Sequence, residues 1–183
     1  LAAAYYLELM GHHAVVFEAK SKLGGMLRYG IPSYRFPRER LDQDIEAILS
    51  TGVEVHLNTK IGSGEGEVPF NKLREEYDAV YIAIGAHEDK KVGIEGEDSK
   101  GVISAVEMLG SIGEEVMPDF KDKTVVVIGG GNVAMDCTRS AVRLGAEFVT
   151  CVYRRRQEDM TAQAEEVEGA IAEGAEVLTL HAP

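Results

Sequence analysis

Residues 124–134 read Thr-Val-Val-Val-Ile-Gly-Gly-Gly-Asn-Val-Ala, a run typical of a buried strand followed at once by three glycines. The spacing Gly129-x-Gly131-x-x-Ala134 is that of a dinucleotide-binding loop between a strand and a helix. Gly129 permits the tight turn, Gly131 lets the backbone approach a pyrophosphate, and the small Ala134 lets the helix pack closely on the strand. The stretch therefore predicts a nucleotide-binding βαβ unit.

The residues after the loop continue this unit at the expected spacing. A helix within residues 129–144 is expected to end at Gly145, and a second strand is expected over residues 148–153. A pyrophosphate would then bind the N–H groups at the positive end of the helix. A glycine-rich turn without a ligand is the alternative, and the strand, helix and second strand around the glycines make it the weaker one.

The end of the second strand indicates which nucleotide is bound. An NAD site usually has Asp or Glu there to hold the ribose hydroxyls, but this chain has Tyr153 followed by three arginines at 154–156. A carboxylate would repel a 2′-phosphate, whereas guanidinium groups can bind it through two hydrogen bonds. The arginines therefore favour NADP(H) over NAD(H). The alternative is that they pair with the acidic segment 165–168, and the two roles are compatible.

The first half of the chain repeats part of the same pattern. Gly11 and Gly145 each stand between a predicted helix and a predicted strand, 134 positions apart, so that Leu1 matches Met135. The first half then corresponds to a dinucleotide-binding unit that lacks its first strand and its phosphate loop. Its second strand ends at Glu18, where an acid would bind the adenosine ribose of FAD or of NAD equally well.

Predicted strands and helices alternate along the whole chain. The pattern predicts strands at 14–18, 53–57, 77–85, 124–128, 148–153 and 176–180, and helices within 1–10, 37–51, 72–76, 104–109, 129–144 and 161–173. This alternation predicts an α/β fold with doubly wound parallel sheets. Two incomplete Rossmann-like units are expected, joined by a charged connector over residues 87–100.

Several motifs in order resemble one family of flavoproteins. They are Phe17-Glu18-Ala19, Gly24-Gly25-Met26-Leu27, Tyr29-Gly30-Ile31-Pro32, Arg35, Ala83-Ile84-Gly85-Ala86, the second glycine loop and Tyr153-Arg154-Arg155. Together they resemble the small (beta) subunit of NADPH-dependent glutamate synthase. They are equally similar to the FAD/NADPH half of dihydropyrimidine dehydrogenase and to flavin subunits of ferredoxin–NADP transhydrogenases. The resemblance covers nearly all 183 residues.

The resemblance implies two sets of cofactor-binding residues. With Gly129 of the fingerprint, the expected NADP(H) contacts are Gly129, Gly130, Gly131, Asn132, Val133, Arg154 and Arg155. The expected FAD contacts are Glu18, Gly24, Gly25, Met26, Arg35, Ile61 and Gly85. Residues 1–100 would be a partial FAD-binding domain and residues 101–183 the first part of an NADP(H)-binding domain. Thr161 stands where one relative has a further basic contact.

The chain also departs from the family it resembles. The upstream iron–sulfur domain, the first FAD glycine loop and the late Gly-Asp motif that closes the flavin site have no counterpart in the sequence, which resembles an internal fragment. The parent reaction implied is hydride transfer from NADPH to FAD. Electrons would then pass to iron–sulfur clusters in a missing domain or in a large electron-accepting partner. The hydride step needs no acid–base residue, so no catalytic residue is predicted.

Two other functions fit parts of the sequence. The chain could be a non-catalytic NADP(H)-binding fragment, or a flavin subunit of a ferredoxin–NADP transhydrogenase-type complex. A simple NADP-dependent dehydrogenase would need a substrate domain with a proton donor, and the sequence offers none. An open strand edge in the incomplete first unit would allow a homo-oligomer.

The composition limits the partners. A formal net charge of −12 argues against nucleic acid and anionic membranes, and no apolar run approaches the length of a membrane span. Cys137 and Cys151 are too few for an iron–sulfur or zinc site, and the five histidines lack ligand spacing, so no metal site is expected. A disulfide between the cysteines is compatible with their spacing, but two reduced core cysteines of a cytoplasmic protein fit better.

Overall fold

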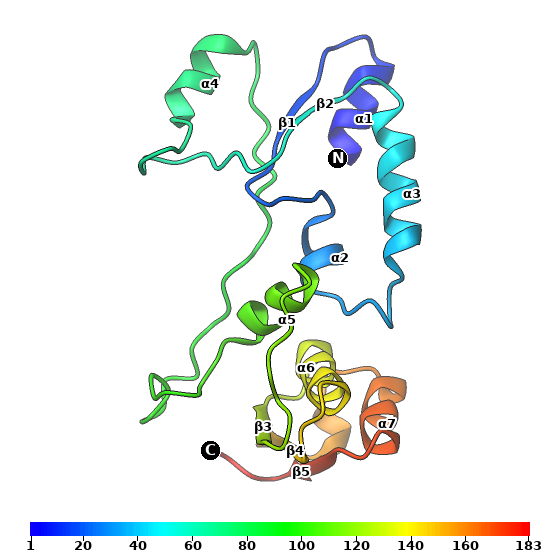
Figure 1. Ribbon diagram of the computed structural model, residues 1–183, viewed down its shortest axis with the longest axis vertical. Helices are drawn as coiled ribbons and strands as arrows, with labels where there is room; N and C mark the ends of the chain where they lie inside the picture. Colours follow the sequence, from blue (N-terminus) through cyan, green and yellow to red (C-terminus); the bar gives the residue numbers. More distant parts are fainter. The chain divides into compact units, whose positions relative to one another are not determined.

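A computed structural model describes residues 1–183, which form two compact units (Figure 1). The first unit contains Leu1–Arg28 and Phe36–Ala86, and the second contains Tyr29–Arg35 and His87–Pro183. The main boundary therefore falls at residues 86–87, whereas the sequence pattern set it near residue 100. The short segment Tyr29–Arg35 belongs to the second unit although residues of the first unit flank it on both sides. The assignment of FAD and NADP(H) to the two halves remains a prediction.

The second unit is built on a parallel three-stranded sheet. Its strands are β3 (Thr124–Ile128), β4 (Phe148–Tyr153) and β5 (Glu176–Thr179), hydrogen-bonded in the order β3-β4-β5. Val127 lies opposite Cys151, and Cys151 lies opposite Val177. The crossover helices α6 (Asn132–Arg143) and α7 (Ala164–Ala172) pack on the sheet and on each other, and α5 (Ala105–Gly113) packs on α6.

The core of this unit lies between the sheet and its helices. Figure 1 shows α6 and α7 on the same side of β3, β4 and β5. Met135, Ala141, Cys151 and Ala170 are fully buried there. Along β3 the residues facing the helices are half-buried, while Val126 on the other face is exposed. The helices thus cover one face of the sheet, which explains why an entirely apolar strand has alternating exposure.

The first unit has a smaller parallel sheet. Its two strands are β1 (Val15–Phe17) and β2 (Glu54–His56), which pair in register from Val15–Glu54 to Phe17–His56. The helices of this unit are α1 (Ala2–Leu9), α2 (Gly25–Tyr29), α3 (Arg38–Leu49) and α4 (Phe70–Glu76). Leu41 and Ile45 of α3 are buried, one helical turn apart, as the apolar spacing of that segment predicts.

Glycines with a left-handed backbone follow four helices, and the pair that defines the internal repeat has nearly the same φ. Gly11 after α1 has φ +86° and Gly145 after α6 has φ +85°. Gly52 after α3 and Gly174 after α7 have φ +106° and +100°. Residues with side chains rarely adopt this left-handed conformation, so glycine is the residue that ends each helix and turns the chain toward the next strand. The α/β architecture with parallel sheets is therefore as predicted.

One predicted strand is wrong. Residues 77–85 form no strand, and most of their side chains are exposed, including Tyr81 and Ile84. Apolar residues on both faces indicate a strand buried in a sheet, but a strand also needs a hydrogen-bonded neighbour. The first sheet consists of β1 and β2 alone, and neither pairs with this segment.

Other differences concern the ends of helices. The helix α2 lies where no helix was predicted, and α5 continues to Gly113, beyond the predicted end at Leu109. The last helix begins at Ala164 rather than at residue 161, because the short 3₁₀ turn η1 (Gln157–Asp159) and the following extended residues occupy the chain before it. The helix α5 has a side-chain N-cap, since the Ser104 hydroxyl accepts the Glu107 N–H at 3.2 Å.

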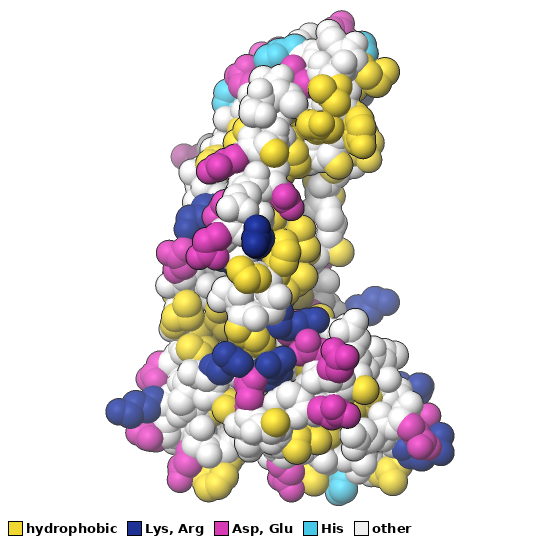
Figure 2. All heavy atoms as spheres, turned by 90° about the vertical axis from the view of Figure 1, so that its right-hand side faces the viewer, with side chains coloured by type: hydrophobic (Ala, Val, Ile, Leu, Met, Phe, Trp, Pro, Cys, Tyr) yellow, Lys and Arg dark blue, Asp and Glu magenta, His cyan; other side chains and the backbone are white.

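The surface carries charged side chains of both signs. On the face drawn in Figure 2, basic and acidic side chains lie interspersed rather than in one large basic field. None of the helices in residues 1–183 is long and apolar enough to cross a membrane.

Candidate functional site

The glycine loop makes the tight turn between β3 and α6. Gly129 has φ +147°, and its N–H donates to the Val152 carbonyl at 3.0 Å, which extends the β3–β4 pairing into the loop. A side chain on Gly129 would put its Cβ 3.2 Å from the Cβ of Ala134. Both the backbone angle and this close approach require glycine here, as the fingerprint predicts.

Gly130 is covered by an aromatic ring that the sequence did not indicate. A Cβ atom on Gly130 would lie 2.6 Å from two carbons of the Tyr153 ring, at the end of β4. The Tyr153 hydroxyl donates to the Asp159 carbonyl at 2.9 Å, which holds the ring over the loop. Gly130 is itself buried. The middle glycine is therefore needed for packing inside the protein as well as for any ligand.

Gly131 is the N-cap of α6, and no side chain caps this helix. The Asn132 side chain instead accepts the Gln163 N–H at 2.9 Å. The Ala162 N–H donates to the Gly130 carbonyl at 3.0 Å, so the segment before α7 is fastened to the loop. The first N–H groups of α6 thus meet no capping side chain, and such groups can bind a pyrophosphate. These residues fit the phosphates of a dinucleotide.

The first turn of α6 divides into an exposed and a buried side. Val133, a predicted contact, is 50% exposed, whereas Met135 is fully buried in the core. Thr161 comes near the same turn, since its Oγ1 would lie 3.4 Å from a Cβ atom on Gly131. A hydroxyl therefore lies beside the loop, at the position where one relative of the family has a basic contact.

The three arginines after β4 differ from one another. Arg154 and Arg155 are exposed, while the Arg156 guanidinium forms ion pairs with Glu158 and with Asp159, the latter at 3.1 Å. The hydrogen bond from Arg156 holds the pKa of Asp159 below its usual range. Two arginines thus remain toward solvent at the strand end where a 2′-phosphate would lie.

The alternative partner for these arginines, the acidic segment 165–168, is engaged elsewhere. Glu166 pairs with Arg139 at 2.6 Å and with Arg35 at 2.9 Å. The structure gives no ion pair between this segment and residues 154–156. The alternative in which residues 154–156 pair with the acidic segment is therefore not seen.

Most of the predicted FAD residues lie in the first unit. The Glu18 Oε1 atom accepts the Lys20 N–H at 2.9 Å, and the Glu18 carbonyl accepts the Thr59 N–H at 2.9 Å. That bond brings the chain before Ile61 beside the end of β1. Ile61 forms an isolated bridge with Val68.

The glycine pair before α2 has a structural requirement of its own. Gly24 has φ +127°, and a Cβ atom there would lie 2.9 Å from the Leu41 side chain. Gly25 has φ +52° with open space around it, and Met26 is exposed. Gly85 also has a positive φ, +70°, and is exposed. Gly24 is thus explained by packing, whereas open space surrounds Gly25.

Arg35, the remaining predicted FAD residue, belongs to the second unit. Its Nη1 atom donates to both carboxylate oxygens of Asp136 at 2.9 Å, and its Nε lies 2.9 Å from Glu166. Asp136 is only 3% exposed. The other six predicted FAD residues lie in the first unit.

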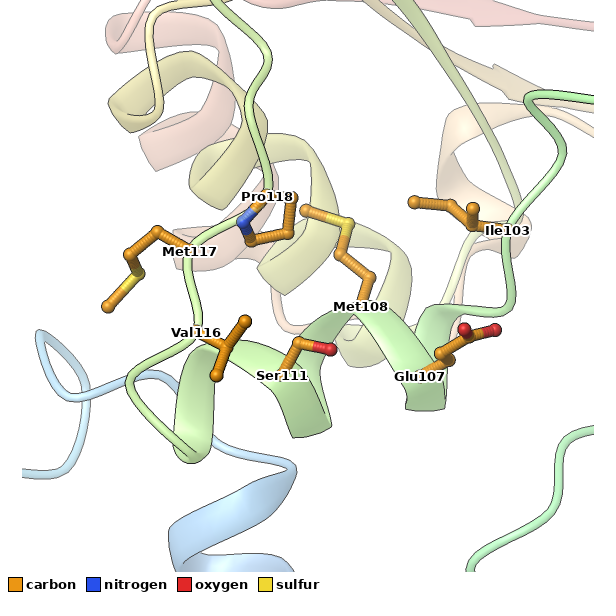
Figure 3. Close-up of a pocket in the computed structure, with 7 residues that line it drawn as sticks. All are labelled: Ile103, Glu107, Met108, Ser111, Val116, Met117 and Pro118. Atoms are coloured by element: carbon orange, nitrogen blue, oxygen red, sulfur yellow. The ribbon is translucent and has the colours of Figure 1, made fainter.

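A separate small pocket lies beside α5 in the second unit. Its volume is about 210 Å³, and it is lined by Ile103, Glu107, Met108, Ser111, Val116, Met117 and Pro118. Figure 3 shows the Met108 side chain reaching toward Pro118, while Met117 points away. None of the predicted cofactor residues lines it, and it is smaller than a typical small-molecule site of about 300 Å³ or more. We assign it no ligand.

A glycine turn that leads from a parallel strand into an uncapped helix defines a dinucleotide-binding domain of the doubly wound class. The chain matches the family described as pyridine nucleotide-disulphide oxidoreductase over residues 1–179. It belongs to this family.

Named relatives are subunits of larger redox proteins. The chain is 47% identical, over 95% of its length, to the NADP(+)-dependent formate dehydrogenase subunit beta of Moorella thermoacetica, of which it covers 24%. It is 43% identical over 95% of its length to the NADPH-Fe(3+) oxidoreductase subunit beta of Geobacter sulfurreducens, covering 26%. The glutamate synthase [NADPH] small chain of Escherichia coli is 38% identical over 96% of this chain, which covers 39% of it. The chain thus spans between a quarter and two fifths of these relatives.

A solved structure shares the fold. FprA from Mycobacterium tuberculosis in complex with NADPH superposes with a TM-score of 0.76 and 25% sequence identity, over 94% of this chain and 44% of FprA. The relatives include glutamate synthase small chains, so the family resemblance found from the motifs is confirmed.

Proposed function

We propose that this chain carries the NADP(H)-binding site and part of the FAD-binding site of an NADPH-dependent flavin oxidoreductase. Exposed Arg154 and Arg155 at the end of β4 support this proposal most directly. An NAD site would have an acid in this position, whereas guanidinium groups bind a 2′-phosphate. The names of three relatives, which specify NADP(+) or NADPH, agree with this choice.

The chain's own residues would bind and orient the nucleotide. The N–H groups of Asn132 and Val133 would hold the pyrophosphate, and the glycines at 129 and 131 would let it approach the backbone. Arg154 and Arg155 would hold the 2′-phosphate through charge-assisted hydrogen bonds. In the first unit, Glu18 would hold the adenosine ribose of FAD. When bound, the nicotinamide and the flavin supply the hydride chemistry, with electrons passing on to iron–sulfur clusters.

The expected partner is a large electron-accepting subunit or an iron–sulfur protein. The relatives' designations as beta subunits and small chains support a multi-subunit setting. The two cysteines are buried and unpaired, which supports a reducing compartment such as the cytoplasm.

The test is a fluorescence titration of the purified chain with NADPH and with NADH. The unchanged chain should bind NADPH more tightly. Arg154→Ala should weaken NADPH binding about 10- to 100-fold, because charged hydrogen bonds are lost, and should change NADH binding little. Arg156→Ala is the matched control: its guanidinium is held by Glu158 and Asp159, so the preference for NADPH should persist. Equal losses for both nucleotides in Arg154→Ala would refute the assignment.

A second function, a non-catalytic NADP(H)-binding module, is favoured by one observation. Arg35 is engaged by Asp136 and Glu166 and belongs to the second unit, whereas the other predicted FAD residues belong to the first. The absorption spectrum of the purified chain near 450 nm distinguishes the two. Flavin absorbance that NADPH bleaches supports the oxidoreductase, and a colourless protein that binds NADPH supports the module.

A further inference from the structure

The segment Tyr29–Arg35 lies against the helix that begins at the glycine loop. Asp136 is on α6, five positions after the N-cap Gly131, and is buried. Arg35 reaches it from the segment and binds both of its carboxylate oxygens at 2.9 Å. The two residues are 101 positions apart in the sequence.

This contact belongs to a larger network on α6 and α7. Arg35 also pairs with Glu166, which pairs with Arg139 at 2.6 Å. Arg139 in turn pairs with Glu173 at 2.7 Å. The Tyr34 ring stacks over this network, with the guanidinium carbons of Arg139 and Arg143 at 4.8 Å and 4.0 Å from the ring centre. Arg143 pairs with Glu173 at 2.8 Å. The network therefore holds three acids and three guanidinium groups, so it carries no net charge.

Asp136 stands where a negative charge affects a bound dinucleotide. Each helical residue adds about 1.5 Å along the axis, so the carboxylate lies less than about 10 Å from the uncapped N-terminus of α6. At that distance in a partly buried site, two like charges repel appreciably. A pyrophosphate at the N-terminus would meet this repulsion unless another charge cancels that of Asp136. Arg35 supplies the cancelling charge.

We infer that Arg35 is a positioning residue for NADP(H): by holding and neutralising Asp136, it keeps the N-terminus of α6 favourable for the pyrophosphate. This inference rests on the proposed function. It gives Arg35 a role in NADP(H) binding, separate from the FAD contact that the family resemblance suggests. It also explains why Asp136, a buried acid close to a phosphate site, can remain on this helix.

The groups around Asp136 determine how its charge depends on pH. Burial raises its pKa, and the hydrogen bond from Arg35 opposes that rise. Glu166 of α7 also raises it, and Arg139 lowers it. The other ionisable groups on these elements include Tyr34 and the buried thiols Cys137 and Cys151, which are neutral near pH 7. Charged groups there are Arg143 and Glu173, which pair with each other, and the exposed acids Glu107, Glu165 and Glu168. Without Arg35, the carboxyl would become protonated at a higher pH than in the unchanged chain.

The experiment measures NADPH dissociation constants from pH 5.5 to 8 for the unchanged chain, Arg35→Ala, Arg35→Lys, Asp136→Asn and the double variant Arg35→Ala/Asp136→Asn. Arg35→Ala should bind about tenfold more weakly at pH 8, and the ratio to the unchanged chain should shrink toward pH 5.5 as Asp136 takes up a proton. Because both proteins bind the same NADPH, the titration of its 2′-phosphate cancels in this ratio. The double variant should recover most of the affinity, and Arg35→Lys should keep part of it.

The variant Asp136→Asn tests the electrostatic effect on its own, and it remains informative even if Arg35→Ala does not fold. It should bind NADPH a few times more tightly than the unchanged chain, because it removes a negative charge near the phosphates. Weaker binding by Asp136→Asn, or no recovery of affinity in the double variant, would overturn the inference. If the unchanged chain does not bind NADPH at all, the proposed function is refuted, and this inference, which rests on it, is refuted too.

Discussion

Replacing each of two adjacent loop glycines, Gly130 and Gly131, by alanine should damage different properties of the protein. A methyl group on Gly130 would lie 2.6 Å from the Tyr153 ring, about 1 Å inside an ordinary carbon–carbon contact. The nearest atom to a methyl group on Gly131 would be the Thr161 Oγ1 at 3.4 Å, and the backbone there has φ −104°. Gly130→Ala should therefore damage folding, whereas Gly131→Ala should damage ligand binding.

The expected cost for Gly130→Ala follows from these contacts. The ring must move, and this breaks the hydrogen bond from Tyr153 to Asp159, worth about 1 kcal/mol. Overpacking of a buried site adds about 1–2 kcal/mol. A total of about 2–3 kcal/mol lowers the melting temperature of a chain of this size by about 5–10 °C. Gly131→Ala should melt within about 2 °C of the unchanged chain, because the new methyl group has room.

The assay combines thermal melts with NADPH titrations. Gly131→Ala should bind NADPH at least tenfold more weakly while folding normally, because its methyl group occupies the surface that the pyrophosphate approaches. Placing Gly130→Ala in a Tyr153→Ala background should make it much less destabilising, since the clashing ring is gone. The reasoning fails if Gly130→Ala melts like the unchanged chain, or if Gly131→Ala is the less stable of the two.

Three further predictions concern the rest of the fold. Gly24→Ala should lower stability by about 2 kcal/mol in urea unfolding, because its φ is +127° and its Cβ would lie 2.9 Å from the Leu41 side chain. Ser104→Ala should cost about 1 kcal/mol by the same measurement through loss of the α5 N-cap, and Ser104→Asp should restore most of it. Hydrogen bonding from Arg143 holds the pKa of Glu173 below its unfolded value, so this stability is present above that value and lost as the pH falls through the folded one. Glu173→Gln should therefore lower the melting temperature at pH 7, and the difference from the unchanged chain should shrink below about pH 4.

Local patterns predicted the strands and helices around the glycines well. The strand over residues 124–128 and the one over 148–153 have the predicted bounds, because an apolar run that ends at a glycine turn has few other structures open to it. The equivalence of Gly11 and Gly145 is likewise visible in sequence, because both positions need a left-handed backbone. Residues 77–85 show the limit of such patterns: composition indicates burial, but strand formation depends on a neighbour elsewhere in the chain.

Sequence patterns propose candidate site residues where ligand chemistry fixes the residue type, and their role in binding stays a prediction. The glycine fingerprint and the strand-end arginines belong to that kind. Contacts among the protein's own residues were not predictable in the same way. Tyr153 over Gly130, and Asn132 with Gln163, join residues 23 and 31 positions apart. The Arg35–Asp136 pair spans 101 positions, and no local spacing rule reaches that far.

The three consecutive arginines show how structure divides residues that look equivalent in sequence. Arg156 pairs with Glu158 and Asp159 and so fixes the short turn after β4. That turn presents the Asp159 carbonyl to Tyr153, whose ring covers Gly130. One arginine thus supports the shape of the glycine loop, and the other two are exposed, as the proposed 2′-phosphate contact requires. Preference for NADP(H) would then depend on Arg154 and Arg155, while Arg156 would affect both nucleotides alike through the loop.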